Sequence, residues 1–336
     1  MSYLRVIACV AIVWLHTFTM EAMFYKNEIS ESYNIASNTM SYIMMWAVPC
    51  FVMVTGALLL NPQKQISIKN IYCRYILRIM LVLVIFVSIF TISDVIANKE
   101  KISFTALIKR IGYKLYTGTS WSHLWYLYLL TGIYILLPEF RALVKVLDDK
   151  ELKYIVLIYF IFNSVIPVIN QVSETQTGFY ITTSSVFPLY LILGYLIHSE
   201  RIRLGMRTCI LMLLIGELFI VGLSVYGIKN QNTAIISMVG NYSFVPVVIA
   251  SVGMFGLFKN IKTGKGNQLL LYADKLSFGI YIIHLAFLRY GIRFGKFNPF
   301  THGGIAMIIL IAAAVFAVSF LLTAILKMIP GIKKIL

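Results

Sequence analysis

The chain has 336 residues, of which 60% are hydrophobic and only 12% are charged, whereas soluble domains carry about 25% charged residues, so composition excludes a soluble enzyme or binding module. The 29 Lys and Arg against 13 Asp and Glu give a formal net charge of +16. In a soluble chain this balance would suggest a nucleic-acid partner, but here the basic residues mostly flank apolar runs, so membrane topology explains them and no nucleic acid is expected.

Ten apolar segments are long enough to cross a lipid bilayer, and they predict an all-α fold, a polytopic transmembrane helical bundle. These segments cover residues 4–23, 38–60, 72–96, 122–138, 152–170, 182–198, 208–227, 239–258, 276–294 and 303–329. With the N-terminus inside, most lysines and arginines fall on the cytoplasmic side, so the positive-inside rule predicts that both termini are cytoplasmic. We expect one membrane domain over residues 1–336, whose first segment is retained because it lacks a signal-peptide cleavage site.

The first segment carries two polar side chains, Arg5 and His16, where a charged or titratable group is costly. Eleven steps of about 100° bring a helix back to within roughly 20° of its starting direction, and the rise between the two residues is roughly 16 Å. Arg5 alone is explained as a side chain that reaches the membrane surface. For His16, a hydrogen bond between helices is the alternative to a functional role. Because the two residues lie on one face and histidine exchanges protons readily near neutral pH, together they predict a functional pair.

The third segment begins with Arg74 and Arg78, which share a face of an α-helix because they are four residues apart. Guanidinium groups match phosphate oxygens, so the pair predicts a phosphate-bearing ligand, with anionic lipid headgroups as the alternative. Residues 97–121 follow on the predicted outer side. Their apolar side chains, such as Leu107 and Ile111, recur at helical spacing opposite lysines, which predicts a helix lying in the membrane interface.

Later segments add candidates for the same site. His123 precedes an aromatic run that includes Trp125, and this run is equally well explained as an interfacial aromatic belt. Ser277, Tyr281 and His284 fall at positions i, i+4 and i+7 of the ninth segment, so they form one polar face.

Two acidic residues also lie within apolar segments, Glu217 in the middle of the seventh and Asp94 near the end of the third. Each is either a neutralised or paired structural carboxylate or part of a site, and the sequence leaves both readings open. The cysteines show no CxxC or Cys/His spacing, so we expect buried thiols and no metal site. They are Cys9, Cys50, Cys73 and Cys209.

In their order along the chain, these motifs resemble the acyltransferase 3 family of integral membrane acyltransferases. In that family the first helix carries a basic residue, ten intervening residues and a histidine, which is the spacing of Arg5 and His16. Four further stretches are similar and come in the same order: Val48-Pro49-Cys50-Phe51 through Thr55-Gly56, the basic start at Arg74 and Arg78, His123-Leu124-Trp125-Tyr126-Leu127 through Pro138, and Ser277-Phe278-Gly279-Ile280-Tyr281 through His284.

The resemblance implies a membrane O-acyltransferase that moves an acetyl or other short acyl group from cytoplasmic acyl-CoA to a hydroxyl of a cell-surface polysaccharide or lipid-linked glycan. It implies the stand-alone type without an extracytoplasmic hydrolase-like domain, placed in the plasma membrane beside other polysaccharide-synthesis proteins. We expect acetyl-CoA or another acyl-CoA as the donor and no metal. The rival interpretation is a transporter or flippase for a glycan intermediate, in which the same polar groups line a path and no covalent product forms.

Within this interpretation His16 is the general base that takes the proton of the acceptor hydroxyl, and an acyl-histidine intermediate is the alternative. We expect the phosphates of CoA to be held by Arg5, Arg74 and Arg78. The residues expected to line the acceptor path or to support His16 are His123, Trp125, Ser277, Tyr281, His284 and Glu217.

Overall fold

The computed structural model describes residues 1–178, 185–261, 267–295 and 297–336, and within these ranges every regular element is a helix. The elements are α1 (Ser2–Phe24), α2 (Glu31–Tyr42), α3 (Ala47–Leu59), α4 (Ile68–Asn70), the π-helical turn η1 (Ile71–Ile76), α5 (Leu77–Ala97), α6 (Phe104–Thr117), the short 3₁₀ turn η2 (Ser122–Leu124), α7 (Trp125–Val146), α8 (Asp149–Phe160), the π-helical turn η3 (Ile161–Val165), α9 (Ile166–Ser173), α10 (Phe187–His198), α11 (Met206–Lys229), α12 (Thr233–Val239), α13 (Val245–Asn260), α14 (Gln268–Gly295), α15 (Ile305–Leu326) and α16 (Pro330–Ile335).

Eight helical stretches in the described part of the chain are long and apolar enough to cross a membrane. They are Ser2–Phe24, Glu31–Leu59, Ile68–Ala97, Ser122–Val146, Asp149–Ser173, Met206–Lys229, Gln268–Gly295 and Ile305–Leu326. The prediction of a polytopic helical membrane protein is therefore confirmed. Where the sequence predicts two further spans, at residues 182–198 and 239–258, the structure has the shorter apolar helices α10 and α13, and residues 182–184 lie outside the described ranges.

The short helix α10 lies inside the protein, where a full bilayer span is not required. Its residues Pro188–Ile197 are all buried, and it packs closely against α3. A Cβ atom on Gly56 would lie 1.9 Å from the carbonyl oxygen of Leu191, and one on Gly194 would lie 2.0 Å from that of Met53. Glycine is required at both positions because the two backbones touch, as is common between membrane helices.

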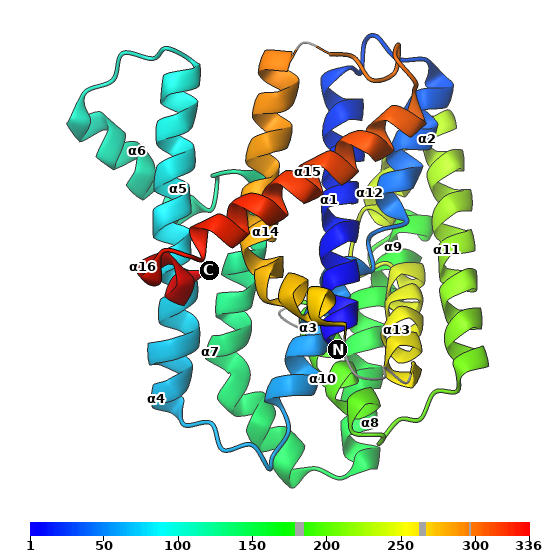
Figure 1. Cartoon of the computed structure of the whole chain (residues 1–336). Coiled ribbons are helices and arrows are strands. Elements are labelled where there is room, and N and C mark those ends of the chain that lie inside the picture. Colours follow the sequence, from blue (N-terminus) through cyan, green and yellow to red (C-terminus); the bar gives the residue numbers. More distant parts are fainter. Residues whose placement is uncertain (179–184, 262–266, 296) are drawn as a thin grey trace.

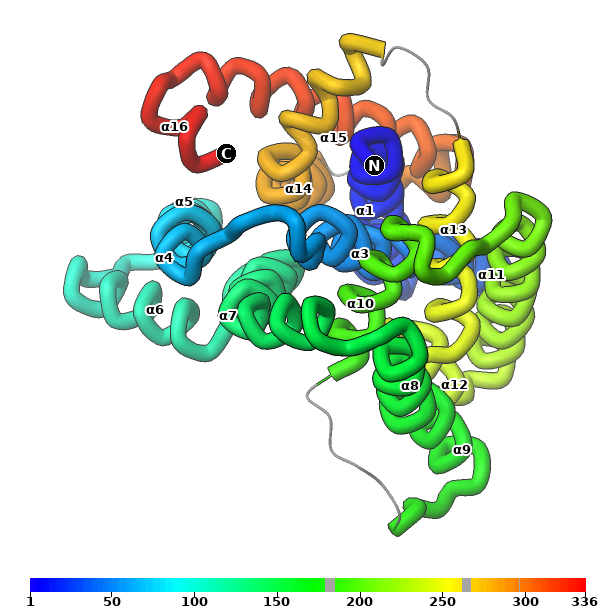
Figure 2. The backbone as a smooth tube through the Cα atoms, turned by 90° about the horizontal axis from the view of Figure 1, so that it is seen from below, coloured from blue at the N-terminus to red at the C-terminus, as the bar shows by residue number. Residues whose placement is uncertain are grey.

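The helix α1 is at the centre of the bundle and packs against α14, α2, α15 and α3. Seen along the helices, α5 and α6 lie on one side of this centre and α11 and α13 on the other, with α3 and α7 between them (Figure 2). The helix α15 crosses the front of α14 and α1 obliquely, and the chain then turns back so that α16 reaches α5 (Figure 1). This return brings the last basic residues of the chain towards the start of the third span.

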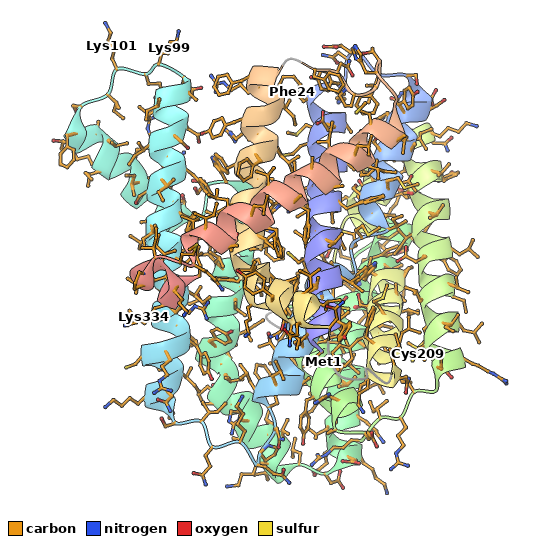
Figure 3. The ribbon with its side chains drawn as sticks, in the orientation of Figure 1. Met1, Phe24, Lys99, Lys101, Cys209 and Lys334 are labelled. Carbon is orange, nitrogen blue, oxygen red and sulfur yellow. The ribbon has the colours of Figure 1, made fainter. Side chains whose placement is uncertain are left out.

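The loop between α5 and α6 lies at the same end of the bundle as the end of α1. Lys99 and Lys101 stand at the level of Phe24, whereas Met1 and Lys334 lie well away from that end (Figure 3). The predicted helix after this loop is confirmed as α6, which begins at the capping residue Ser103 and ends at Gly118 with a positive φ. The cytoplasmic location of both termini and the interfacial location of α6 stay predictions.

Candidate active site

A cavity of about 1300 Å³ lies where α1, α3, α5, α7, α14 and the α15–α16 segment meet. Basic side chains dominate its polar lining, and Asp274 is the acidic residue among them. The basic residues are Arg5, Lys64, Arg78, Lys275, Lys327, Lys333 and Lys334. A cavity with this excess of positive charge suits a ligand with several negative charges.

Arg5 reaches the cavity wall from the first turns of α1. Its guanidinium forms a 2.6 Å ion pair with Asp274 at the start of α14, and the Asp274 side chain is only 8% exposed. Further along the same two helices, the Cys9 thiol donates to the carbonyl oxygen of Ser277, and the ring of His16 faces His284. Arg5 and His16 thus both face α14, which confirms that they share one side of α1.

Arg78 reaches the cavity from α5, opposite Arg5. Its Nε donates to the carbonyl oxygen of Ile335 at 2.8 Å and its NH2 to that of Leu336 at 2.7 Å, while its guanidinium lies 5.2 Å from the centre of the Phe278 ring. A guanidinium has five N–H groups, so these two bonds leave donors for a further acceptor.

Lys327, which follows α15, also lines the cavity. Burial, and to a smaller extent the positive charge of Arg78, lower its pKa below the ordinary lysine value. An anion bound between these two cations would relieve their repulsion.

Arg74 does not join Arg78 in the cavity. The two residues would share a face in an α-helix, but residues Ile71–Ile76 form a π-helical turn, in which the wider i to i+5 bonding changes the angle between positions four apart. Arg74 is exposed and is absent from the cavity lining, as is the neighbouring Cys73. The prediction that all cysteines are buried is therefore wrong for Cys73, and it is correct for the other three.

Three histidines from different parts of the chain come together beyond the cavity. The centre of the His16 ring lies 5.3 Å from that of His284 and 6.4 Å from that of His123, and the latter two lie 5.5 Å apart. The side chains of His123 and His284 are fully buried. The sequence singles out each of the three, and the fold brings them into one cluster.

Hydrogen bonds to backbone carbonyls orient two of these imidazoles. His284 Nδ1 lies 2.6 Å from the carbonyl oxygen of Tyr281, and His123 Nε2 lies 2.9 Å from that of Ile282. Because a carbonyl oxygen only accepts, each of these nitrogens carries the proton and donates. The opposite nitrogens, His284 Nε2 and His123 Nδ1, are buried without a partner among the described residues, so each presents a lone pair within the cluster.

Tyr281 lies between the cavity and the histidine cluster, with Tyr126 beside it. Both line the cavity, and their ring centres lie 5.6 Å apart. The Tyr281 ring also lies 5.7 Å from that of His123 and 6.0 Å from that of His284, and its hydroxyl donates to the backbone carbonyl of His123. The partition between cavity and imidazoles is thus one aromatic ring thick.

The remaining predicted residues take other positions. Ser277 lines the cavity, and its hydroxyl donates to the carbonyl oxygen of Asp274 at 2.8 Å. Trp125 is half-buried and stacks on Tyr242 at 5.5 Å, outside the cavity lining. Glu217 lies on α11, which packs mainly on α13 and α2, and its carboxylate is buried with no hydrogen-bond partner within the described ranges.

Asp94, which the sequence leaves open, is a paired carboxylate. It accepts a 3.0 Å hydrogen bond from the indole of Trp121 and forms ion pairs with Arg289 at 3.2 Å and Lys114 at 3.8 Å. These contacts connect α5, α6 and α14 and give Asp94 a structural role.

Sequence reasoning missed Asp274, Tyr126, Tyr134 and the lysines of the C-terminal segment as members of the site. The lysines carry a signal, since they count towards the positive-inside pattern, but that pattern does not show which of them converge. With respect to metals, no group of His, Cys, Asp and Glu side chains in the described ranges is arranged to hold an ion, and this includes the three histidines.

The fold and the site define a polytopic helical membrane protein in which a basic cavity leads to buried imidazoles. A family model for an acyltransferase domain, that of the acyltransferase 3 family, matches residues 1–326. The chain therefore belongs to this family and is a membrane acyltransferase, as the order of its motifs predicts. No curated protein and no solved structure matches it.

Proposed function

We propose that the protein is an O-acyltransferase that moves an acetyl or other short acyl group from cytoplasmic acyl-CoA to a hydroxyl of a surface polysaccharide or lipid-linked glycan. The observation that carries this proposal is the basic cavity whose lining includes Tyr281, a ring in contact with the imidazoles of His123 and His284. Family membership supports acyl transfer, and the cavity supports the kind of donor.

Acyl-CoA combines a multiply phosphorylated nucleotide with a long, thin arm that ends in the thioester. The cavity, at about 1300 Å³, exceeds the usual 300–1,000 Å³ of small-ligand pockets and suits so large a donor. We assign the phosphates to Arg5, Arg78 and the neighbouring lysines, with the arm directed along α7 towards Tyr126. Arg74 lies outside this cavity and receives no role.

In the proposed reaction His16 accepts the proton of the acceptor hydroxyl as the hydroxyl oxygen attacks the thioester carbonyl carbon. The carbon–sulfur bond then breaks, the thiolate of CoA leaves, and the proton held by His16 passes to this sulfur. The rings of His284 and His16 pack together with their centres 5.3 Å apart, so His284 suits a role in holding the His16 ring in position. The acceptor approaches from the side of the cluster away from the cavity, past His123.

The test is to supply purified protein in lipid with labelled acetyl-CoA and a glycan extract from cells that carry the gene. We expect an alkali-labile ester on the glycan and none with a His16→Ala variant. Movement of glycan across the bilayer without a labelled product would instead support the transporter or flippase interpretation.

A further inference from the structure

We infer that the Tyr126 hydroxyl donates a hydrogen bond to the thioester carbonyl oxygen as negative charge develops there. This inference rests on the proposed function and adds a catalytic residue to it. Attack on a thioester needs such a donor, because the carbonyl π electrons move onto the oxygen when the carbon becomes tetrahedral.

Tyr126 is placed where the arm of the donor would end. It lies near the start of α7, is 8% exposed and lines the cavity, in ring contact with Tyr281 and with Phe51 at 6.2 Å. Tyr134 lines the same cavity two turns further along α7, about 12 Å away at 1.5 Å per residue. The α7 wall thus extends from Tyr134 on the nucleotide side to Tyr126, which contacts Tyr281 and through it the histidine cluster.

The Tyr126 hydroxyl has no hydrogen-bond partner among the described residues, as is also true of Tyr134 on the same cavity wall, whereas several other tyrosines of the bundle are bonded. Tyr281 donates to the carbonyl oxygen of His123, Tyr128 to that of Leu115 at 2.8 Å, and Tyr190 to that of Tyr242 at 2.6 Å. This hydroxyl is not among the fully buried polar atoms that lack a partner, so its oxygen is open to the cavity that Tyr126 lines. A hydroxyl donor that is open to the cavity and has no protein partner is suited to bind a group of the ligand.

With Tyr126 as the donor to the carbonyl oxygen, every electron pair and proton of the transfer step is accounted for. The acceptor oxygen forms the new bond to carbon, the carbonyl π pair moves to the oxygen held by Tyr126, and His16 holds the acceptor proton. When this pair returns to re-form the carbonyl, the carbon–sulfur bond breaks and CoA thiolate leaves with the bonding electrons. Tyr126 keeps its own proton throughout, so it differs in role from His16.

The decisive variant is Tyr126→Phe, which keeps the ring and removes only the hydroxyl. With labelled acetyl-CoA and the glycan extract, we expect kcat to fall roughly 10²–10³-fold, the loss typical of removing one oxyanion donor. The KM for acetyl-CoA and the affinity for CoA itself should stay within about twofold, because the hydroxyl acts on the developing charge. The matched control is Tyr128→Phe, which removes a hydroxyl two residues away that is bonded to Leu115 outside the cavity, and its kcat should change by about twofold at most.

A second measurement separates hydrogen bonding from packing. Fluorotyrosines incorporated at position 126 keep the ring shape and make the phenol a stronger donor, so kcat should vary in a graded way with fluorination, whereas a packing role would leave kcat unchanged. Ester formation that is unaffected by Tyr126→Phe would overturn the role of this tyrosine alone. If the wild-type protein forms no ester at all, the proposed function and this inference both fail.

Discussion

The cations that line the cavity remain partly open to solvent, whereas the imidazoles of His123 and His284 are fully buried. Arg5 and Arg78 meet the cavity through long, adaptable side chains, while the two imidazoles are fixed by bonds to backbone carbonyls. Phosphate recognition tolerates water and some freedom of the side chain, but proton transfer requires a defined nitrogen at a defined place. The two regions should therefore respond differently to substitution and to salt.

The largest effect should come from the histidine cluster. We expect His16→Ala to lower the turnover of acetyl-CoA by about 10³-fold or more, within the range attributed to general bases. CoA binding, measured by calorimetry, should be unchanged because His16 does not line the cavity. The control is His302→Ala, at an exposed histidine, and retained turnover in His16→Ala would exclude the base role.

Orientation of His16 by His284 is the next test of the buried region. His284→Asn keeps a donor near the position of Nδ1, towards the carbonyl of Tyr281, but loses the lone pair at Nε2. We expect kcat to fall roughly 10–100-fold through misplacement of His16, with KM little changed. His284→Gln, which keeps a polar group near Nε2, should retain more activity. A kcat that is unchanged in His284→Asn would argue against orientation of His16 by His284.

Local sequence patterns predict much of this molecule because a bilayer requires apolar helices with internally bonded backbones. The prediction of membrane spans is least accurate where a helix is surrounded by other helices of the protein and not by lipid. The helix α10 is apolar throughout but short, since α3 and other helices surround it and Gly56 and Gly194 allow close contact. Hydropathy alone does not distinguish such an internal helix from a span.

The candidate site shows the same limit at the level of single residues. Arg5, His16, His123 and His284 are recognisable from the sequence because polar side chains in apolar helices are expensive. The membership of Lys327 is not recognisable, since it depends on the oblique path of α15 and the return of α16 to α5 (Figure 1). Periodicity fails for Arg74 because it assumes an α-helix where the chain forms a π-helical turn.

Substitutions in the basic cavity should have smaller effects, and these effects should change the binding of the acyl donor. Loss of one charged hydrogen-bond donor is worth about 1.5–3 kcal/mol when buried, and less for a side chain as exposed as Arg78. We expect Arg78→Ala to raise the KM for acetyl-CoA about tenfold at nearly constant kcat. Arg74→Ala, one turn away and outside the cavity, should change KM by less than about twofold. A larger rise in KM for Arg74→Ala than for Arg78→Ala would contradict the assignment of the cavity to the phosphates of the donor.

The smallest predicted effect is that of salt, and it compares the two regions in the unmodified protein. Raising ionic strength from about 0.05 to 0.5 M shortens the screening length to well below 10 Å. The attraction between the cavity cations and the phosphates of the donor should weaken, so we expect the KM for acetyl-CoA to rise about threefold to fivefold. His16 takes up its proton beside the fully buried imidazoles of His123 and His284, where screening by ions is weak, so kcat at saturating donor should stay within about twofold. A kcat that falls with salt while KM stays constant would place the salt-sensitive charges at the histidine cluster, contrary to the proposed division between the basic cavity and this cluster.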